Sequence, residues 1–174
     1  MASDHCPHSP GNGPLSIPRK STTLPLAAAA LAVVAALAFI AAKDPHYDIR
    51  PGARAENAQC ARMVDEAPDR LAGKPHHSTG IPGVVVWGDN EIVLRCGVPE
   101  PGPTTDPCFA ADGVDWVLHE KRSTEGGKVI TTYGRSPATE VTFTGSASAP
   151  DAALVELSAL VAPIKQTAQC IQPD

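Results

Sequence analysis

The sequence lacks the short signatures that mark common classes of hydrolase, phosphate-binding protein and zinc protein. It contains no Gly-x-Ser-x-Gly, no Ser-x-x-Lys and no His-Glu-x-x-His motif. It has no glycine-rich phosphate loop, and no two cysteines form a Cys-x-x-Cys pair. We therefore expect no catalytic residue, no metal and no other cofactor that a motif would reveal. A site assembled from dispersed residues is not excluded, because motifs do not detect such sites.

Basic side chains are also in the minority. The 174 residues include 14 Lys and Arg against 19 Asp and Glu, a formal net charge of −5 at pH 7. From residue 43 onward, twelve basic residues stand against eighteen acidic ones. An acidic surface of this kind argues against nucleic acid as a partner. It also argues against electrostatic binding of anionic lipid by a cluster of basic residues.

One run of nineteen residues, 24–42, has no charged side chain and predicts a single transmembrane helix. As a helix it would be about 28 Å long, close to the thickness of a bilayer's hydrocarbon core. A cleaved signal peptide is the alternative, because basic residues precede the run and the Ala-Leu-Ala sequence at 36–38 could form a cleavage site. The run continues for four residues beyond that sequence, which is long for a cleaved signal. We therefore expect the helix to be retained.

This helix would divide the chain into four parts. Residues 1–23 are rich in Pro, Gly, Ser and His, and we expect a disordered cytoplasmic tail. Residues 43–54 combine Pro, Gly and charge, which predicts a linker. Residues 55–174 are the only segment able to fold, and their length suits one small domain.

Cysteine usage indicates which side of the membrane carries that domain. Four cysteines follow the apolar run, an even set that suits two disulfides in an oxidising compartment. We therefore expect a single-pass protein of the cell membrane with its C-terminal domain outside the cytoplasm. Of the three possible pairings, we predict Cys96 with Cys108, which would close a proline-rich loop, and Cys60 with Cys170, which would clamp the first helix to the chain end.

The pattern of residues 55–174 predicts an α+β fold, a small antiparallel sheet with two helices packed on one face. Apolar stripes predict one helix at residues 56–67 and another after residue 148. Residues 74–82 and the proline-rich residues 97–108 predict loops. Strands are predicted at residues 84–87, 92–96, 114–120, 128–135 and 138–144.

Alternation along these strands separates a core face from a polar face. The core face contains Ile92, Leu94, Cys96, Val114, Trp116, Leu118, Val141 and Phe143. The opposite face contains Glu91, Arg95, Asp115, His119 and Glu140. A solvated face is the ordinary explanation for such a row in an antiparallel sheet. A shallow charged site, in which Arg95 or Arg135 binds an anion in bidentate fashion, is the functional alternative.

Three sequences within the domain, read together, resemble a known family. They are WGDNEIVLRCGVPEP at 87–101, GVDWV at 113–117 and TTYGRSPATEV at 131–141. The chain is similar to the actinobacterial family of membrane-tethered envelope proteins known as domain of unknown function 3515. Asn90 departs from the proline expected there, but it occupies a turn. The resemblance implies an exported or membrane-tethered envelope protein, and it brings no activity, cofactor or catalytic residue.

Two functions from different classes follow. The first is a non-catalytic binding or structural module that contacts an envelope protein or a cell-wall component. Its candidate binding residues are Trp87, Arg95, Tyr133 and Arg135, together with the loop between Cys96 and Cys108, although both aromatic side chains could simply be packed. The alternative is an extracytoplasmic hydrolase or transferase with a dispersed active site. That site would combine Arg95, Asp115, His119, Tyr133 and Arg135, and a pocket uniting these side chains would favour it.

Overall fold

The computed structural model describes residues 47–147 and 150–171. The predicted tail at 1–23, the predicted membrane helix at 24–42 and the first residues of the predicted linker lie outside the described residues. Within the described part of the chain, no helix is long and apolar enough to cross a membrane.

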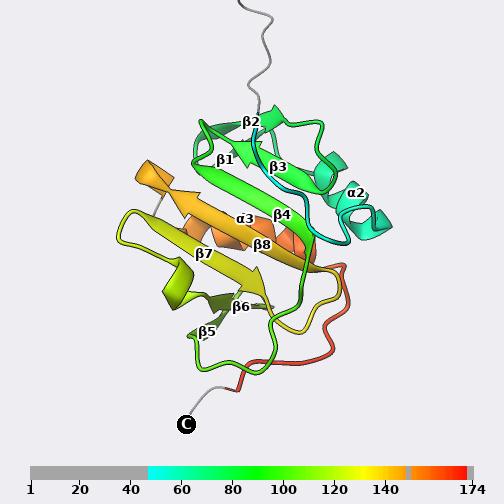
Figure 1. The fold of residues 1–174 in the computed structure, drawn as a ribbon, viewed down its shortest axis with the longest axis vertical. Coiled ribbons are helices and arrows are strands. Elements are labelled where there is room, and N and C mark those ends of the chain that lie inside the picture. The colour runs from blue at the N-terminus through cyan, green and yellow to red at the C-terminus, as the bar shows by residue number, and fades with distance from the viewer. Residues whose placement is uncertain (1–46, 148–149, 172–174) are drawn as a thin grey trace, which may run out of the picture. The chain divides into compact units, whose positions relative to one another are not determined.

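An antiparallel sheet of eight strands dominates the domain and runs in the order β1-β2-β3-β4-β8-β7-β6-β5 (Figure 1). Neighbouring strands are hairpin partners except at the centre, where β8 inserts between β4 and β7. The strands are β1 (Arg70–Leu71), β2 (Lys74–Ser78), β3 (Val84–Trp87), β4 (Ile92–Val98), β5 (Cys108–Ala111), β6 (Val114–Leu118), β7 (Gly127–Thr132) and β8 (Ala138–Thr144).

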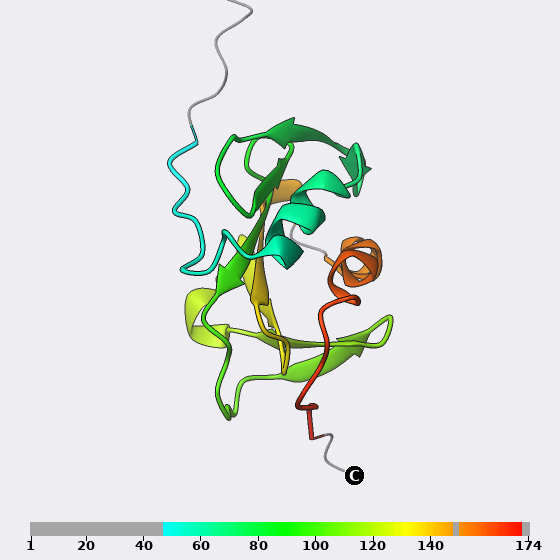
Figure 2. The ribbon, with the colours of Figure 1, turned by 90° about the vertical axis from the view of Figure 1, so that its right-hand side faces the viewer.

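Two α-helices, α2 (Ala58–Asp65) and α3 (Asp151–Val161), lie on the same side of this sheet (Figure 2). The two ends of the sheet curve toward that side, so the helices occupy its concave face. The Asn57 side chain caps α2 by accepting a hydrogen bond from the backbone N–H of Gln59 (2.9 Å). The other helices among the described residues are single 3-10 turns, η1 (Glu120–Arg122) and η2 (Gly145–Ala147). The predicted α+β architecture is confirmed, with a sheet larger than expected.

The core fills the space between the concave face and the two helices. Every residue predicted for the core face is fully buried except Leu118, which is partly buried against the same cluster. The two buried tryptophans satisfy their indole groups inside this core. Trp87 Nε1 donates to the carbonyl of Pro68 (2.8 Å), and Trp116 Nε1 donates to Ser158 Oγ on α3 (3.0 Å). The first bond ties β3 to the chain that follows α2, and the second ties β6 to α3.

Two of the strands missing from the prediction involve predicted loops: β2 lies within the predicted loop at 74–82, and β5 begins at the last residue of the predicted loop at 97–108. The segment at β2 reads KPHHS and has no apolar alternation, but its backbone pairs with β3, with His76 opposite Trp87. β5 begins directly after Pro107 and pairs with β6 over four residues. Both strands lie toward the ends of the sheet, where backbone pairing can form without two apolar faces. Periodicity alone does not detect such strands.

The chain just before α2 packs closely on β4. A side chain at Gly97 would bring its Cβ within 2.4 Å of the Arg54 backbone, and Gly52 is in similarly tight contact with residues 96–97. The backbone N–H of Arg54 donates to the Gly97 carbonyl (2.9 Å). Only glycine permits two backbones to approach this closely.

The predicted disulfide pairing is wrong. The bonds are Cys60–Cys96, which joins α2 to β4, and Cys108–Cys170, which joins β5 to the end of the chain. Cys96 lies on the concave face and therefore faces α2, with a Cα–Cα distance of 5.3 Å to Cys60. Cys108 lies four strands further along the sheet, roughly 19 Å away at about 4.8 Å per strand. A disulfide tolerates a Cα–Cα separation of at most about 7 Å, so Cys96 cannot reach it.

Candidate functional site

The polar side chains predicted to share one site lie in two separate groups. The first group lies on the convex face of the sheet, and we call it the outer-face network. Its members are Arg95, Asp106, His119, Arg122, Thr131 and Glu140. The second group surrounds the end of the chain and contains Asp115 and Arg135.

Glu140 is the centre of the outer-face network. It lies opposite Arg95 in the β4–β8 register and is only 4% exposed. Its two carboxylate oxygens are each bound by an arginine, Oε1 by Arg95 Nη1 (3.1 Å) and Oε2 by Arg122 Nη1 (2.6 Å). The hydrogen bond to Glu140 raises the pKa of Arg122. Arg95 is thus engaged within the protein, where the sequence suggested a bidentate anion site.

A second part of this network contains a histidine between a carboxylate and a hydroxyl. His119 Nε2 lies 2.8 Å from Thr131 Oγ1, and Nδ1 lies 3.5 Å from Asp106 Oδ2. A base held between an acid and a hydroxyl is the arrangement that activates a nucleophile. Thr131 is however only 2% exposed, within the sheet beside Glu140. Its hydroxyl is inaccessible to a substrate, so the arrangement positions the loop that carries Asp106.

Arg135 belongs to the second group and is 5% exposed. Its Nη1 donates to the carbonyls of Ala162 (3.1 Å) and Ile164, just after α3, and its Nη2 donates to Gln166 Oε1 (3.3 Å). Burial lowers the pKa of Arg135, against the opposing effect of the Asp115 carboxylate. Arginine remains protonated even so. Its cation therefore fixes the chain that leaves α3.

We call residues 164–171 the C-terminal strap. Asp115 Oδ2 accepts hydrogen bonds from Gln166 Nε2 and from the backbone N–H of Cys170, both at 2.8 Å. The strap crosses Gly134 so closely that a Cβ there would lie 2.0 Å from the Ala168 carbonyl oxygen. Thr167 N donates to the Gly134 carbonyl (2.7 Å). Asp115, Gly134 and Arg135 therefore serve to seat the strap.

The strap and the proline-rich loop, residues 99–107, enclose an open hollow of about 490 Å³, the strap hollow. Tyr133 forms part of its wall, with Thr104, Thr105 and Asp106 from the loop and Gln169 and Ile171 from the strap. The Cys108–Cys170 disulfide joins the two walls. The volume of the strap hollow falls within the roughly 300–1,000 Å³ typical of small-ligand sites.

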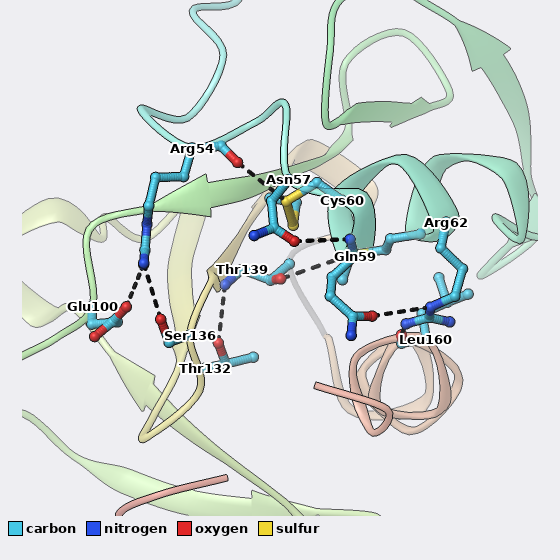
Figure 3. Close-up of a disulfide and its surroundings, with 12 residues drawn as sticks. Arg54, Asn57, Gln59, Cys60, Arg62, Glu100, Thr132, Ser136, Thr139 and Leu160 are labelled. Carbon is cyan, nitrogen blue, oxygen red and sulfur yellow. Dashed lines mark hydrogen bonds and ion pairs between the residues drawn. A yellow bond between two sulfur atoms is a disulfide. The ribbon is translucent and has the colours of Figure 1, made fainter. Parts of the chain in front are cut away.

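The loop is fixed at both ends. Arg54 extends from the segment before α2 to Glu100 at the start of the loop and to Ser136 Oγ (3.0 Å), as Figure 3 shows. Ser136 also forms a hydrogen bond to Glu100, and this bond together with the one from Arg54 lowers the pKa of Glu100. The disulfide fixes the other end, and within the loop Thr104 Oγ1 accepts from the backbone N–H of Asp106 (3.0 Å). The loop is thus preorganised.

A second hollow of about 300 Å³ lies between α2 and the turn that joins β2 to β3. Ala61, Val64, Ile81 and Pro82 supply its apolar lining, with carboxylates from Glu56 and Asp65. Trp87 does not line it. That tryptophan is 0% exposed and lies beside His76, with 6.0 Å between the ring centroids.

Of the four predicted binding residues, only Tyr133 lines one of the two hollows described above. Trp87 is packed in the core, Arg95 is bound to Glu140 and Arg135 is bound to the strap. The predicted loop does line the strap hollow, but Gln169 and Ile171 were missed because Cys170 was paired with the wrong cysteine. In the described part of the chain, no group of three or more His, Cys, Asp or Glu side chains is arranged to hold a metal ion.

Comparison with known proteins gives a family and no function. No curated protein and no solved structure shows significant similarity to the chain. One family model, described as "Protein of unknown function (DUF3515)", matches residues 23–170. That match covers most of the sequence, so the chain belongs to the DUF3515 family.

Proposed function

We propose that the protein is a non-catalytic binding module of the cell envelope, held at the membrane by one N-terminal helix with its folded domain outside the cytoplasm. The observation that carries this proposal is the strap hollow, an open cavity between two segments joined by a disulfide. Its residues are presented to solvent on a rigid frame, and none of its described neighbours fills it.

Preorganisation supports a binding role. The loop wall is held by the Arg54–Glu100 ion pair at its start and by the disulfide at its end. The strap wall is held by Asp115 and Arg135. A surface that is already ordered loses little conformational entropy when a ligand binds. Such fixation favours recognition at the hollow over a purely structural role for the loop.

The distribution of polar groups argues against the hydrolase or transferase alternative. Arg95 and His119 belong to the outer-face network, whereas Asp115 and Arg135 seat the strap. Each of the four has a partner within the protein, and no described hollow brings them together. A dispersed active site needs such groups to converge on one substrate atom.

The membrane and envelope parts of the proposal depend on the sequence and the cysteines. The apolar run at 24–42 has the length of a membrane span. All four cysteines of the folded domain are paired in disulfides, which persist in oxidising compartments. Both observations support a domain outside the cytoplasm.

Site-specific photocrosslinking in intact cells tests the binding role. A benzophenone amino acid replaces Thr105, which lines the hollow, or Glu125, an exposed control residue in the loop before β7. We expect an adduct from position 105 that disappears with Tyr133→Ala, and no comparable adduct from position 125. Equal adducts from both positions, or none from either, would contradict the proposal. Turnover of an envelope substrate that stops with His119→Ala or Asp115→Ala would establish the enzyme alternative.

A further inference from the structure

The strap hollow offers hydrogen-bonding groups but almost no charge. Its polar side chains are the hydroxyls of Thr104, Thr105 and Tyr133 and the amide of Gln169. Asp106 supplies its only charged group, and that carboxylate is directed to His119, 3.5 Å away. No lysine or arginine is among the described residues that line it.

Several of these groups are available to a ligand. The side chains of Thr105, Tyr133 and Gln169 make no hydrogen bond to another described residue. Hydroxyl and amide groups both donate and accept, so they match a partner that also presents donors and acceptors together. Around them lie apolar surfaces from the Tyr133 ring, Pro103, Pro107 and the disulfide.

We infer that the strap hollow binds a neutral, polyhydroxylated ligand, a segment of a carbohydrate chain. This inference rests on the proposed function, because it names the ligand of the same site. Sugar hydroxyls pair with Thr105, Tyr133 and Gln169, and the apolar face of a sugar ring packs on the Tyr133 ring.

Charge excludes the main alternatives. A phosphate or uronate polymer would need cations to bind its anions, and the hollow instead contains a carboxylate. The domain as a whole is also acidic, which repels a polyanion at a distance. An apolar peptide would leave the available hydroxyl and amide groups without partners as it excluded water from them.

Titration calorimetry on the full-length protein tests the ligand class. The detergent has a polyoxyethylene headgroup, so that no detergent sugar competes for the site. The probe is the neutral β-1,4-linked tetramer of N-acetylglucosamine, and the comparison is a tetrasaccharide that contains glucuronate. We expect saturable binding of the neutral tetramer and at least fivefold weaker binding of the anionic one.

Variants place the binding at the hollow. Tyr133→Ala should weaken binding at least tenfold, Gln169→Ala several-fold, and Tyr133→Phe, which keeps the ring, less than threefold. The matched control is Tyr47→Ala, which removes the other tyrosine of the chain. Tyr47 is not among the residues that line the hollow, and its pKa is raised by burial and by Asp89 in the turn between β3 and β4. Unchanged melting temperatures confirm that each variant is folded.

The outcomes separate this inference from the proposed function. No binding of the neutral tetramer, preference for the anionic one, or equal binding by Tyr133→Ala would each overturn the inference. The photocrosslinked adduct at position 105 then decides the broader proposal. An adduct of peptide mass that depends on Tyr133 overturns the carbohydrate ligand and supports the binding module. An adduct of carbohydrate mass supports both.

Discussion

The carboxylate of Asp115 on β6 accepts a hydrogen bond from the backbone N–H of Cys170 at 2.8 Å, across 55 residues of sequence. The same oxygen accepts from Gln166 Nε2, so one side chain fixes the strap at two points. Cys170 is also the residue that forms the disulfide to β5. The position of the strap, and with it one wall of the hollow, therefore depends on a side chain that the sequence suggested for catalysis.

Replacement of Asp115 should loosen the strap. Asp115→Ala removes two hydrogen bonds to a charged acceptor, and each lost partner costs about 1–3 kcal/mol where the donor stays buried. We expect a lower unfolding free energy and faster amide exchange confined to residues 164–171. Thr124→Ala, at an exposed turn residue, provides the control. If residues 164–171 exchanged their amide hydrogens at the same rate in Asp115→Ala and in the unmodified protein, this role would be contradicted.

Loss of Glu140 should destabilise the centre of the sheet. Glu140→Ala leaves Arg95 and Arg122 facing each other without the carboxylate that both bind. Because the arginine side chains are 27% and 50% exposed, solvent reduces the penalty, and we expect about 1–3 kcal/mol. Chemical denaturation measures it. Glu125→Ala should change the unfolding free energy by less than about 0.5 kcal/mol, as surface substitutions do.

The Trp116–Ser158 bond lends itself to a double-mutant cycle. Trp116→Phe removes the indole donor and leaves the Ser158 hydroxyl in the core with one partner fewer. We expect the unfolding free energy to fall, and about 1–3 kcal/mol of that fall comes from the unpaired hydroxyl. Ser158→Ala in the same background should recover part of it, giving a nonzero coupling energy. Strict additivity of the two changes would show that the bond contributes nothing.

The two disulfides should contribute similarly to stability but differently to binding. They span 36 and 62 residues, for which the chain-entropy relation gives about 4 kcal/mol each. We expect similar falls in unfolding free energy for the Cys60→Ala/Cys96→Ala and Cys108→Ala/Cys170→Ala pairs. Only the second pair should abolish crosslinking from position 105. Peptide mapping without reduction checks the connectivity, and a Cys96–Cys108 peptide would contradict it.

The ion pair between Arg54 and Glu100 should depend on pH. Hydrogen bonds to Glu100 lower its pKa below the ordinary 4.5. The contribution of the ion pair to the unfolding free energy is therefore fully present above pH 4.5. It is lost as the pH falls through the lower folded-state pKa. The difference in melting temperature between Glu100→Gln and the unmodified protein should be small, since Glu100 is 43% exposed, and constant from pH 6 to 8. It should shrink below about pH 4.5.

Local patterns predicted the parts of the fold in which one face is apolar. The strand at 138–144 has the predicted bounds, and the alternating residues of β4 and β6 face the core as expected. β2 was missed because its sequence carries no such pattern and its pairing is determined by β3. The length of the sheet could therefore not be deduced from periodicity.

The site was harder to predict than the fold, for a different physical reason. Arg95 and Arg135 occur in the sequence as cations that could bind a ligand, and only tertiary packing brings Glu140 and the strap carbonyls to them. The disulfide pairing depends equally on strand order, because Cys96 and Cys108 are close in sequence and four strands apart in the sheet. The sequence named Tyr133 and the proline-rich loop, which do line the strap hollow, but it did not indicate the distant strap residues that complete the wall.

The connectivity of the disulfides has a consequence for how the domain matures. In the folded domain, the first cysteine in the sequence, Cys60, pairs with the second, Cys96. The third, Cys108, pairs with the fourth, Cys170. A chain that emerges from its N-terminal end first presents the two members of each pair consecutively. Among these four cysteines of the folded domain, oxidation in order of synthesis therefore yields the native bonds directly. Thiol exchange is then required only where a bond forms out of that order.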